Sequence, residues 1–497
     1  MKKILIVPVL FFAAIGFAQE KQEETNTYKK RVLETTEVDF LTSYYSQDGN
    51  NASVTGGIGD EHLTDFTPTF VVSVPLNDDD VLTIDAGFSA YTSASSSNLD
   101  PFDRTKEVTT SNPAAISSAS SSGSGNNNST TRVVAPTPWA ASSGASSGDV
   151  WASISADYSH SSDDRNTIVN ADVSLANEFD YTSIGFGGGI TKLFNEKNTT
   201  LNVSAKVYLD AWKPVYPTEL DTYFVDANEN LNNSFFGNVD ILDQSGSAIN
   251  KNGSNIWSPV KSPVINDKAR NSYSLSFSFS QILSKNAQIS LFFDLVQQDG
   301  WLSNPMQRVY FGDVDNYYIG NPGDNNINIV NYDTPINKDV FQLADDIERL
   351  PSTRFKIPVG MRLNYYLNEI FTLRTYYRFY SDDWGITSHT AEIELPIKIS
   401  SKFTLYPSYR YYNQTAADYF APYEANVSTS EFYTSDYDLS KFNANQYGFG
   451  VSYTDIFAKT HIGKFGLKSI DLKYNSYERN TGLTAGIISA GFKFVMD

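Results

Sequence analysis

Hydrophobic and polar residues alternate with a period of two through much of the chain, most clearly between Arg354 and Tyr412. Successive side chains of a β-strand point to opposite faces, so this period predicts strands with one apolar and one polar face. Four runs of about ten residues follow one another here, and the third extends from Thr390 through Lys398. The apolar positions of the first run are Phe355, Ile357, Val359, Met361, Leu363 and Tyr365.

Two folds fit these four runs. A soluble sandwich would bury the apolar face and leave the charged face in water. A membrane barrel would show the apolar face to lipid and surround a wet interior with the charges. The four runs alone do not separate these interpretations, and the rest of the chain has to decide between them.

The connections between predicted strands sort by parity. Links after even-numbered strands are mostly short, and the very long connections follow odd-numbered strands, at 93–148, 213–266, 299–349 and 413–443. This is typical of barrels with short periplasmic turns and long extracellular loops. We therefore predict an all-β fold, a single transmembrane antiparallel β-barrel of about 16 strands, within a range of roughly 14 to 18.

The start of the chain has the composition of an export signal. Lys2 and Lys3 precede an apolar run, and Gly16-Phe17-Ala18 ends it. We expect residues 1–18 to be a signal peptide, 19–36 a periplasmic tail and 37–497 the barrel. No segment has about 18 consecutive apolar residues, so a membrane helix is not predicted. The expected location is the bacterial outer membrane, with both ends of the barrel chain in the periplasm.

The composition of the chain limits the classes of molecule that it is expected to bind. The chain has no cysteine, which rules out a disulfide scaffold, and its formal net charge is −20. An acidic balance argues against nucleic acid, which attracts basic surfaces. The expected partners are outer-membrane lipid, the barrel-assembly machinery and an envelope protein. The 93–148 connection is rich in Ser, Thr, Asn and Gly, so we predict a mobile loop there.

Charged residues on the polar faces are the candidate functional residues. If adjacent strands stack these residues, they form a ladder of cations with two carboxylates. One interpretation is an anion-attracting constriction, and the other is an ion-paired filling that braces the wall. The candidates for the lumen or selectivity site are Arg362, Arg374, Arg378, Glu392, Glu394, Lys398 and Arg410.

The sequence gives little support for a catalytic site or a metal site. The four histidines have no pair at metal-ligand spacing, so no metal or cofactor is predicted. Ser388 and His389 are adjacent in a predicted strand, where neighbouring side chains point to opposite faces. We therefore expect no catalytic residues and no enzyme activity.

Several segments resemble blocks of a bacterial family. They are WLSNPMQRV (301–309), ERLPSTR (348–354), YRFYSDDWGITSHT (377–390) and PSYRYYNQTAADYF (407–420), with SGASSGD (143–149) before them. The chain resembles the domain-of-unknown-function family numbered 3570. The resemblance implies an outer-membrane β-barrel, and it hints at a redox-linked envelope system. No catalytic residue follows from it.

Two functions remain as hypotheses. The first is a porin-like, transport-related channel for small solutes with a charged lumen. The second is a closed barrel that serves as a surface scaffold for a partner protein in a redox-linked envelope system.

Overall fold

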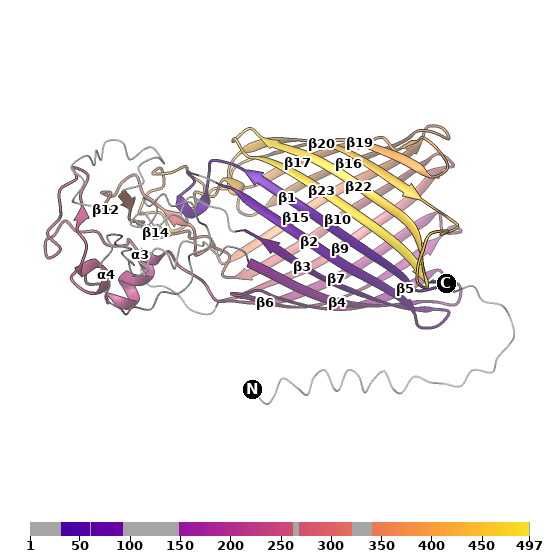
Figure 1. Cartoon of the computed structure of the whole chain (residues 1–497), viewed down its shortest axis with the longest axis horizontal. Coiled ribbons are helices and arrows are strands. Elements are labelled where there is room, and N and C mark those ends of the chain that lie inside the picture. Colours follow the sequence, from indigo (N-terminus) through magenta and orange to yellow (C-terminus); the bar gives the residue numbers. More distant parts are fainter. Residues whose placement is uncertain (1–30, 60, 93–148, 262–267, 321–339, 497) are drawn as a thin grey trace, which may run out of the picture.

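The computed structural model describes residues 31–59, 61–92, 149–261, 268–320 and 340–496. These residues form a β-barrel with a smaller folded assembly at one end (Figure 1). Helices in this part of the chain are short, and none has the length and apolar character needed to cross a membrane. The predicted signal peptide 1–18, most of the 19–36 tail and the 93–148 connection lie outside the described residues.

Sixteen long antiparallel strands make the barrel wall, as predicted. The first eight are β1 (Glu37–Asp48), β2 (Leu63–Pro75), β3 (Asp80–Tyr91), β4 (Asp149–Ser161), β5 (Thr167–Asn177), β6 (Tyr181–Phe194), β7 (Thr199–Trp212) and β9 (Lys268–Ser284). The other eight are β10 (Ala287–Gly300), β15 (Thr353–Tyr366), β16 (Thr372–Asp382), β17 (Thr387–Glu394), β19 (Phe403–Gln414), β20 (Phe442–Thr454), β22 (Phe465–Arg479) and β23 (Thr484–Met496). Two short strands, β18 (Ile397–Lys398) and β21 (His461–Ile462), pair with β19 and β22.

Each long strand pairs with the next along the chain, and the first pairs with the last. In these registers Phe40 of β1 lies opposite Phe70 of β2 on one side and Phe492 of β23 on the other. The pairing of β1 with β23 closes the sheet into a ring, so no strand edge of the ring is left without a partner.

The connections confirm the parity rule where the structure describes them. Thr36, next to β1, and Met496, in β23, lie at the end of the barrel that carries the short turns. Met496 N donates to Thr36 O at 2.9 Å. The longer connections after β7, β10 and β19 gather at the opposite end (Figure 1). We call these the turn end and the crown end.

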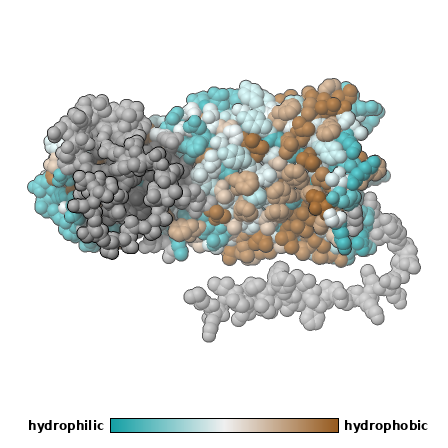
Figure 2. Space-filling view, in the orientation of Figure 1, coloured by the Kyte–Doolittle hydropathy of each residue, from teal (hydrophilic) through white to brown (hydrophobic). Residues whose placement is uncertain are grey.

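The outer surface of the barrel is apolar. Brown, apolar residues gather on the visible face of the barrel toward the turn end in Figure 2. Large apolar side chains at alternate positions of the barrel strands are exposed, for example Ile154, Phe186, Phe449 and Leu472, each about half exposed. Water would not favour such a surface, whereas a bilayer would. The barrel is therefore a transmembrane barrel.

The third run of the 354–412 stretch differs from the prediction. We predicted one strand from Thr390 through Lys398, but β17 ends at Glu394 and β18 begins at Ile397. Pro396 has no N–H group and cannot donate to a neighbouring strand. Its carbonyl instead accepts from Thr372 N at 3.1 Å.

The connections at the crown end pack into one folded assembly, which we call the crown. It comprises the described residues of 49–62, 213–261, 301–320, 340–352 and 415–441. Its elements are η1 (Ser53–Thr55), α3 (Thr218–Asp221), η4 (Thr222–Asp226), α4 (Ser234–Gly237), β8 (Ile241–Leu242), β11 (Arg308–Val309), β12 (Tyr318–Gly320), β13 (Val340–Gln342), β14 (Asp346–Ile347) and η6 (Tyr437–Leu439).

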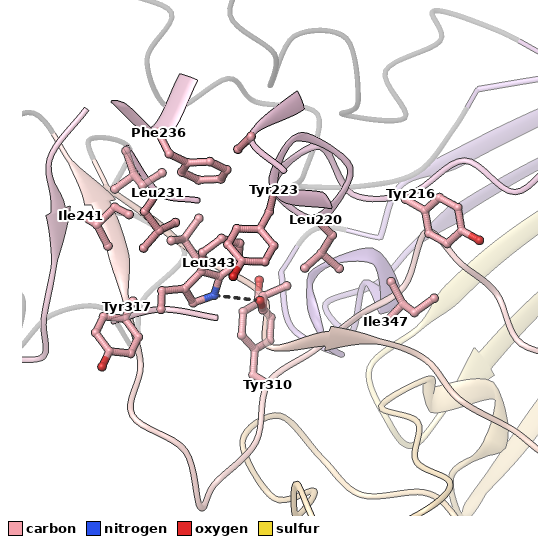
Figure 3. Close-up of a cluster of buried hydrophobic side chains, with 14 residues drawn as sticks. Tyr216, Leu220, Tyr223, Leu231, Phe236, Ile241, Tyr310, Tyr317, Leu343 and Ile347 are labelled. Carbon is pink, nitrogen blue, oxygen red and sulfur yellow. Dashed lines mark hydrogen bonds between the residues drawn. The ribbon is translucent and has the colours of Figure 1, made fainter. Parts of the chain in front are cut away.

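The crown has its own hydrophobic core (Figure 3). Phe236 and Trp257 are almost fully buried, with ring centroids 5.4 Å apart. The Trp257 indole N–H donates to the Ala344 carbonyl at 3.1 Å, so the polar atom of this buried ring is satisfied. Residues of the connections after β7 and β10 thus share one core.

Connections from opposite sides of the barrel meet in the crown. Val54 and Gly56 follow β1, the first long strand, whereas Arg308 and Tyr310 follow β10, the ninth of sixteen. Arg308 Nη1 donates to Val54 O at 2.9 Å, and a side-chain atom on Gly56 would lie 2.6 Å from the Tyr310 ring. The crown therefore extends across the mouth of the barrel, above the lumen.

Candidate functional site

A charged cavity of about 690 Å³ lies inside the barrel against the wall from β15 to β22. Alternation along each strand determines which residues reach it: the apolar residues of β16 face outward, and Arg374, Tyr376 and Arg378 face inward. The charged lining is made by five arginines and three carboxylates, namely Arg362, Arg374, Arg378, Arg410, Arg479, Glu392, Glu394 and Asp438.

Two of the arginines pair with glutamates on neighbouring strands. Arg374 Nη1 lies 3.0 Å from Glu394 Oε1, and Arg410 donates to Glu392 Oε2 from Nε at 2.9 Å and from Nη2 at 2.5 Å. Lys473 adds a longer contact to Glu394, 3.6 Å. These arginine side chains are 50% and 43% exposed, so water in the lumen reduces what the pairs contribute to stability.

Two other arginines have no carboxylate within 4.0 Å among the described residues. The Arg362 guanidinium lies over the rings of Phe292 and Tyr376, 5.8 Å and 5.4 Å from their centroids. Arg378 is partly buried, and its Nε has no hydrogen-bond partner in the described protein. Both arginines thus line the cavity without a carboxylate that balances their charge.

The crown contacts the lumen through the far end of β22. Arg479 Nη1 lies 2.6 Å from Asp438 Oδ1, and the guanidinium lies over the Phe442 ring, 4.4 Å from its centroid. Gln414 Nε2 donates to the carbonyls of Asp438 and Ser440 at 2.9 Å and 2.6 Å. The connection between β19 and β20 is therefore fixed to the rim of the lumen.

Most of the predicted site residues come together. Arg362, Arg374, Arg378, Glu392, Glu394 and Arg410 line the same cavity. Lys398 lies in β18 at the turn end, is exposed, and borders neither this cavity nor a second one of about 590 Å³ beside it. The second cavity shares Arg374 and Glu394 with the first.

Sequence reasoning missed several residues that line or contact the charged cavity. Lys473, Arg479 and Phe292 alternate with outward-facing residues of their strands, and this signal could have found them. Asp438 comes from a long connection with no period, so nothing in the local sequence places it beside Arg479.

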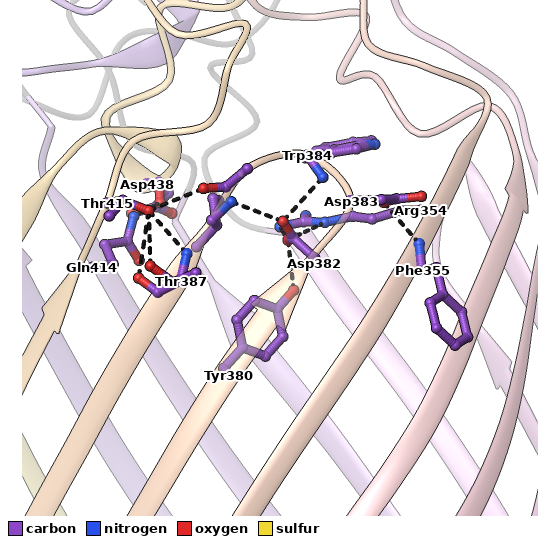
Figure 4. A network of polar contacts seen from close by, with 12 residues as sticks. Arg354, Phe355, Tyr380, Asp382, Asp383, Trp384, Thr387, Gln414, Thr415 and Asp438 are labelled. Atoms are coloured by element: carbon purple, nitrogen blue, oxygen red, sulfur yellow. Dashed lines mark hydrogen bonds and ion pairs between the residues drawn. The ribbon is translucent and has the colours of Figure 1, made fainter.

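Arg354, which shares the polar face of β15, belongs instead to the rim at the crown end (Figure 4). Its Nε donates to Asp382 Oδ2 at 2.9 Å, and its guanidinium lies 4.3 Å from the centroid of the Trp384 ring. Asp382 also accepts from Tyr380 Oη at 2.8 Å and from Trp384 N at 3.1 Å. This fully buried carboxylate organises the link between β16 and β17.

Ser388 and His389 lie on opposite faces of β17. Ser388 is buried, whereas His389 Nδ1 lies 2.7 Å from Tyr377 Oη beside the outward-facing rings of β16. Within the described ranges, no group of three or more His, Cys, Asp or Glu side chains is arranged to hold a metal ion.

Solved structures with similar folds include outer-membrane proteins. A bacterial polysaccharide outer membrane secretin aligns with a TM-score of 0.39 and 8% identity, over 93% of this chain and 98% of that one. The outer membrane protein OpdK from Pseudomonas aeruginosa gives 0.34 and 8%, over 93% and 99%. The toluene transporter TodX from Pseudomonas putida gives 0.35 and 7%, over 94% and 90%.

No curated protein matches the chain. A family described as "Protein of unknown function (DUF3570)" matches residues 7–486, which include every strand of the barrel except most of β23. The match agrees with the resemblance carried by the blocks between residues 301 and 420. The chain, a closed sixteen-stranded transmembrane barrel with a charged lumen, therefore belongs to the DUF3570 family.

Proposed function

We propose that the protein is an outer-membrane pore for small charged solutes, with the cavity between β15 and β22 as its selective section. The observation that carries this proposal is the excess of arginine in that cavity, five guanidinium groups against three carboxylates. A section of a wet passage whose lining carries more cations than carboxylates raises the local concentration of anions in that section. A sixteen-stranded barrel is also wide enough to leave an aqueous interior.

The barrel is oriented with its turn end in the periplasm and its crown outside the cell. Short turns on the periplasmic side and longer connections on the outer side are the usual arrangement in bacterial barrels. Both ends of the barrel chain then lie in the periplasm. In this orientation the crown covers the outer mouth and restricts access to the lumen.

Single-channel recording in planar bilayers tests the pore. The purified full chain should conduct, and its reversal potential in a KCl gradient should show a preference for chloride. The variant Arg374→Ser/Arg378→Ser removes two of the five arginines that line the cavity, which leaves three arginines and three carboxylates in that lining. Its chloride preference should therefore fall, by roughly threefold or more in permeability ratio.

Lys197→Ser/Lys285→Ser is the matched control. It also removes two cations, but from the exposed turns after β6 and β9. Its selectivity should stay closer to that of the unmodified protein. Absence of conductance in the unmodified chain, in the arginine variant and in Arg308→Met would eliminate the pore. Arg308→Met loosens the crown, because it removes the side chain that donates to the Val54 carbonyl.

A second function is a surface scaffold that holds an envelope partner protein. The folded core of the crown favours it, because Phe236, Trp257 and Tyr433 are buried to an extent unusual for barrel loops that only stay hydrated. A stoichiometric partner recovered from detergent-solubilised membranes, and lost when the crown is loosened, would support the scaffold. Recovery of the barrel alone would favour the pore.

A further inference from the structure

Three aspartates face the lumen from the wall opposite the arginines. Asp85, Asp157 and Asp172 lie on β3, β4 and β5, at positions that alternate with the exposed apolar residues Ile84 and Val173. Asp157 and Asp172 are direct partners in the pairing of β4 with β5. The three carboxylates therefore form a compact acidic surface on the inside of the barrel, which we call the acidic wall.

A gap in side-chain bulk beside the acidic wall leaves it open to the lumen. The neighbouring strand β6 presents Gly185, Gly187 and Gly189 to the interior. A side-chain atom on Gly187 would lie 2.3 Å from Asp172 Oδ1, so the carboxylate occupies the space over this glycine. Lys206 pairs with one residue of the acidic wall: its Nζ lies 3.2 Å from Asp172 Oδ2.

The acidic wall faces the arginines that line the cavity from β15, β16 and β19, which we call the arginine wall: Arg362, Arg374, Arg378 and Arg410. In the closed ring β4 is the fourth long strand and β17 the twelfth, so seven long strands lie between them in either direction. Asp85 and Asp172 lie near the middle of their strands, and Arg378 and Arg410 lie near the middle of β16 and β19. Opposite charges thus line opposite sides of the mid-section of the lumen.

Such an arrangement produces an electric field across the lumen, perpendicular to the direction of transport. A solute with one charge is attracted to one wall and repelled by the other. A solute with a separated anion and cation gains from both walls when it lies across the passage. The low-dielectric wall of the barrel strengthens this field in the water between the two surfaces.

We infer that the lumen selects small zwitterions, solutes that carry a carboxylate and an ammonium group a few bonds apart, over uncharged molecules of the same size. The inference depends on the proposed pore function, because it names the class of solute that the same passage favours. The carboxylate of the solute lies toward Arg362 and Arg378, which have no carboxylate partner, and its ammonium group lies toward Asp85 and Asp157.

Swelling of proteoliposomes that contain the full chain tests the inference. The two probes are γ-aminobutyrate, a zwitterion at pH 7, and N-(2-hydroxyethyl)acetamide, an uncharged molecule with the same atomic formula. We expect the zwitterion to cross faster by roughly threefold or more. The variant Asp85→Asn/Asp157→Asn/Asp172→Asn should bring the ratio of the two rates close to one, because it removes one side of the field.

The matched control is Glu196→Gln/Glu229→Gln/Glu369→Gln, which removes three exposed carboxylates outside the lumen and should keep the ratio. Equal rates for the two probes in the unmodified protein would overturn the zwitterion inference and leave the pore standing. An unchanged ratio in the aspartate variant would overturn the role of the acidic wall. If neither probe crosses, even with a loosened crown, both the pore and the inference fail.

Discussion

Arg308 and Glu219 form a two-contact ion pair inside the crown. Arg308 Nε lies 2.6 Å from Glu219 Oε1, and Nη2 lies 3.1 Å from Oε2. The two side chains are 3% and 0% exposed. Glu219 follows β7 and Arg308 follows β10, and the same guanidinium reaches the carbonyl of Val54 after β1. One arginine therefore joins three connections across the mouth.

Replacement of Arg308 should loosen the crown and spare the barrel. Arg308→Met keeps much of the side-chain volume but leaves the Glu219 carboxylate buried without its partner, which costs about 3–5 kcal/mol in comparable pairs. We expect amides of residues 213–261 and 301–320 to exchange hydrogen much faster, while barrel amides keep their rates. Hydrogen-exchange mass spectrometry in detergent measures both regions in one sample.

The double variant Arg308→Met/Glu219→Gln is the control for this pair. It removes both charges, so no buried carboxylate is left alone, and exchange in the crown should return part of the way toward the original rates. Equal exchange in the single variant and the unmodified protein would show that the pair does not hold the connections together.

The crown should be less stable at pH 8 than at pH 5. Burial raises the pKa of Glu348 from its ordinary value of 4.5 to about 8, and burial raises the pKa of Asp345 to about 7. The folded crown therefore holds protons that the unfolded segments release above about pH 4.5. Stability is full below that pH and falls as the pH rises to about 8.

We expect crown amides to exchange roughly tenfold or more faster at pH 8 than at pH 5, after correction for the intrinsic pH dependence of exchange. Glu348→Gln cannot ionise and keeps an acceptor for Thr434 Oγ1, which donates to Glu348 Oε1 at 2.6 Å. The pH dependence should be smaller in this variant. A dependence of the opposite sign would contradict the assignment.

Asp382 should be more important than its neighbour Asp383 for the rim between β15 and β17. The Asp382 side chain is fully buried and accepts from Arg354, Tyr380 and two backbone N–H groups. Asp382→Ala leaves Arg354 without its partner, so we expect a loss of about 3 kcal/mol in stability. The shift between folded and unfolded mobility on a gel, followed against temperature, measures it. Asp383→Ala, which removes an acceptor for Phe355 N, should have a smaller effect.

Two adjacent positions on β4 should differ strongly in how much the same substitution destabilises the barrel. Ile154 is 50% exposed on the apolar outer surface, and Ser155 faces the lumen beside the acidic wall. Ile154→Arg places a charge in lipid and should destabilise the barrel by about 2–4 kcal/mol. Ser155→Arg lies opposite Asp85 in the pairing with β3 and should cost little. Denaturant unfolding from lipid vesicles compares the two variants.

The period-two pattern predicted the strands, because a strand with one lipid-facing and one water-facing side alternates apolar and polar residues. The sorting of the long connections by strand parity then favoured a membrane barrel over a sandwich. The pattern also identified inward-facing residues correctly: six of the seven predicted lumen residues line one cavity. Lys398 was the exception, since Pro396 interrupts the strand that was expected to carry it.

The crown could not be predicted in the same way. Its core joins Trp257 to Phe236 and Tyr310 to Tyr423 through connections that have no common period. The ion pair of Arg308 with Glu219 links residues 89 positions apart. Such contacts depend on how whole connections meet in space, and local sequence patterns carry no record of that. The sequence alone also did not reveal that the acidic wall faces the arginine wall, because that relation depends on the number of strands in the closed barrel.

Because β1 pairs with β23, the junction between the first and the last strand has the same backbone pairing as the other strand pairs of the ring. The backbones of Thr36 and Met496 are already hydrogen-bonded at the turn end, so a short peptide could join the two ends of the barrel chain there. The chain could then be opened at another tight turn of the same rim, such as the one at Lys285 and Asn286 between β9 and β10, without the loss of a single strand pair. A circularly permuted protein of this kind would have the same wall, the same lumen and the same crown, with a different order of synthesis.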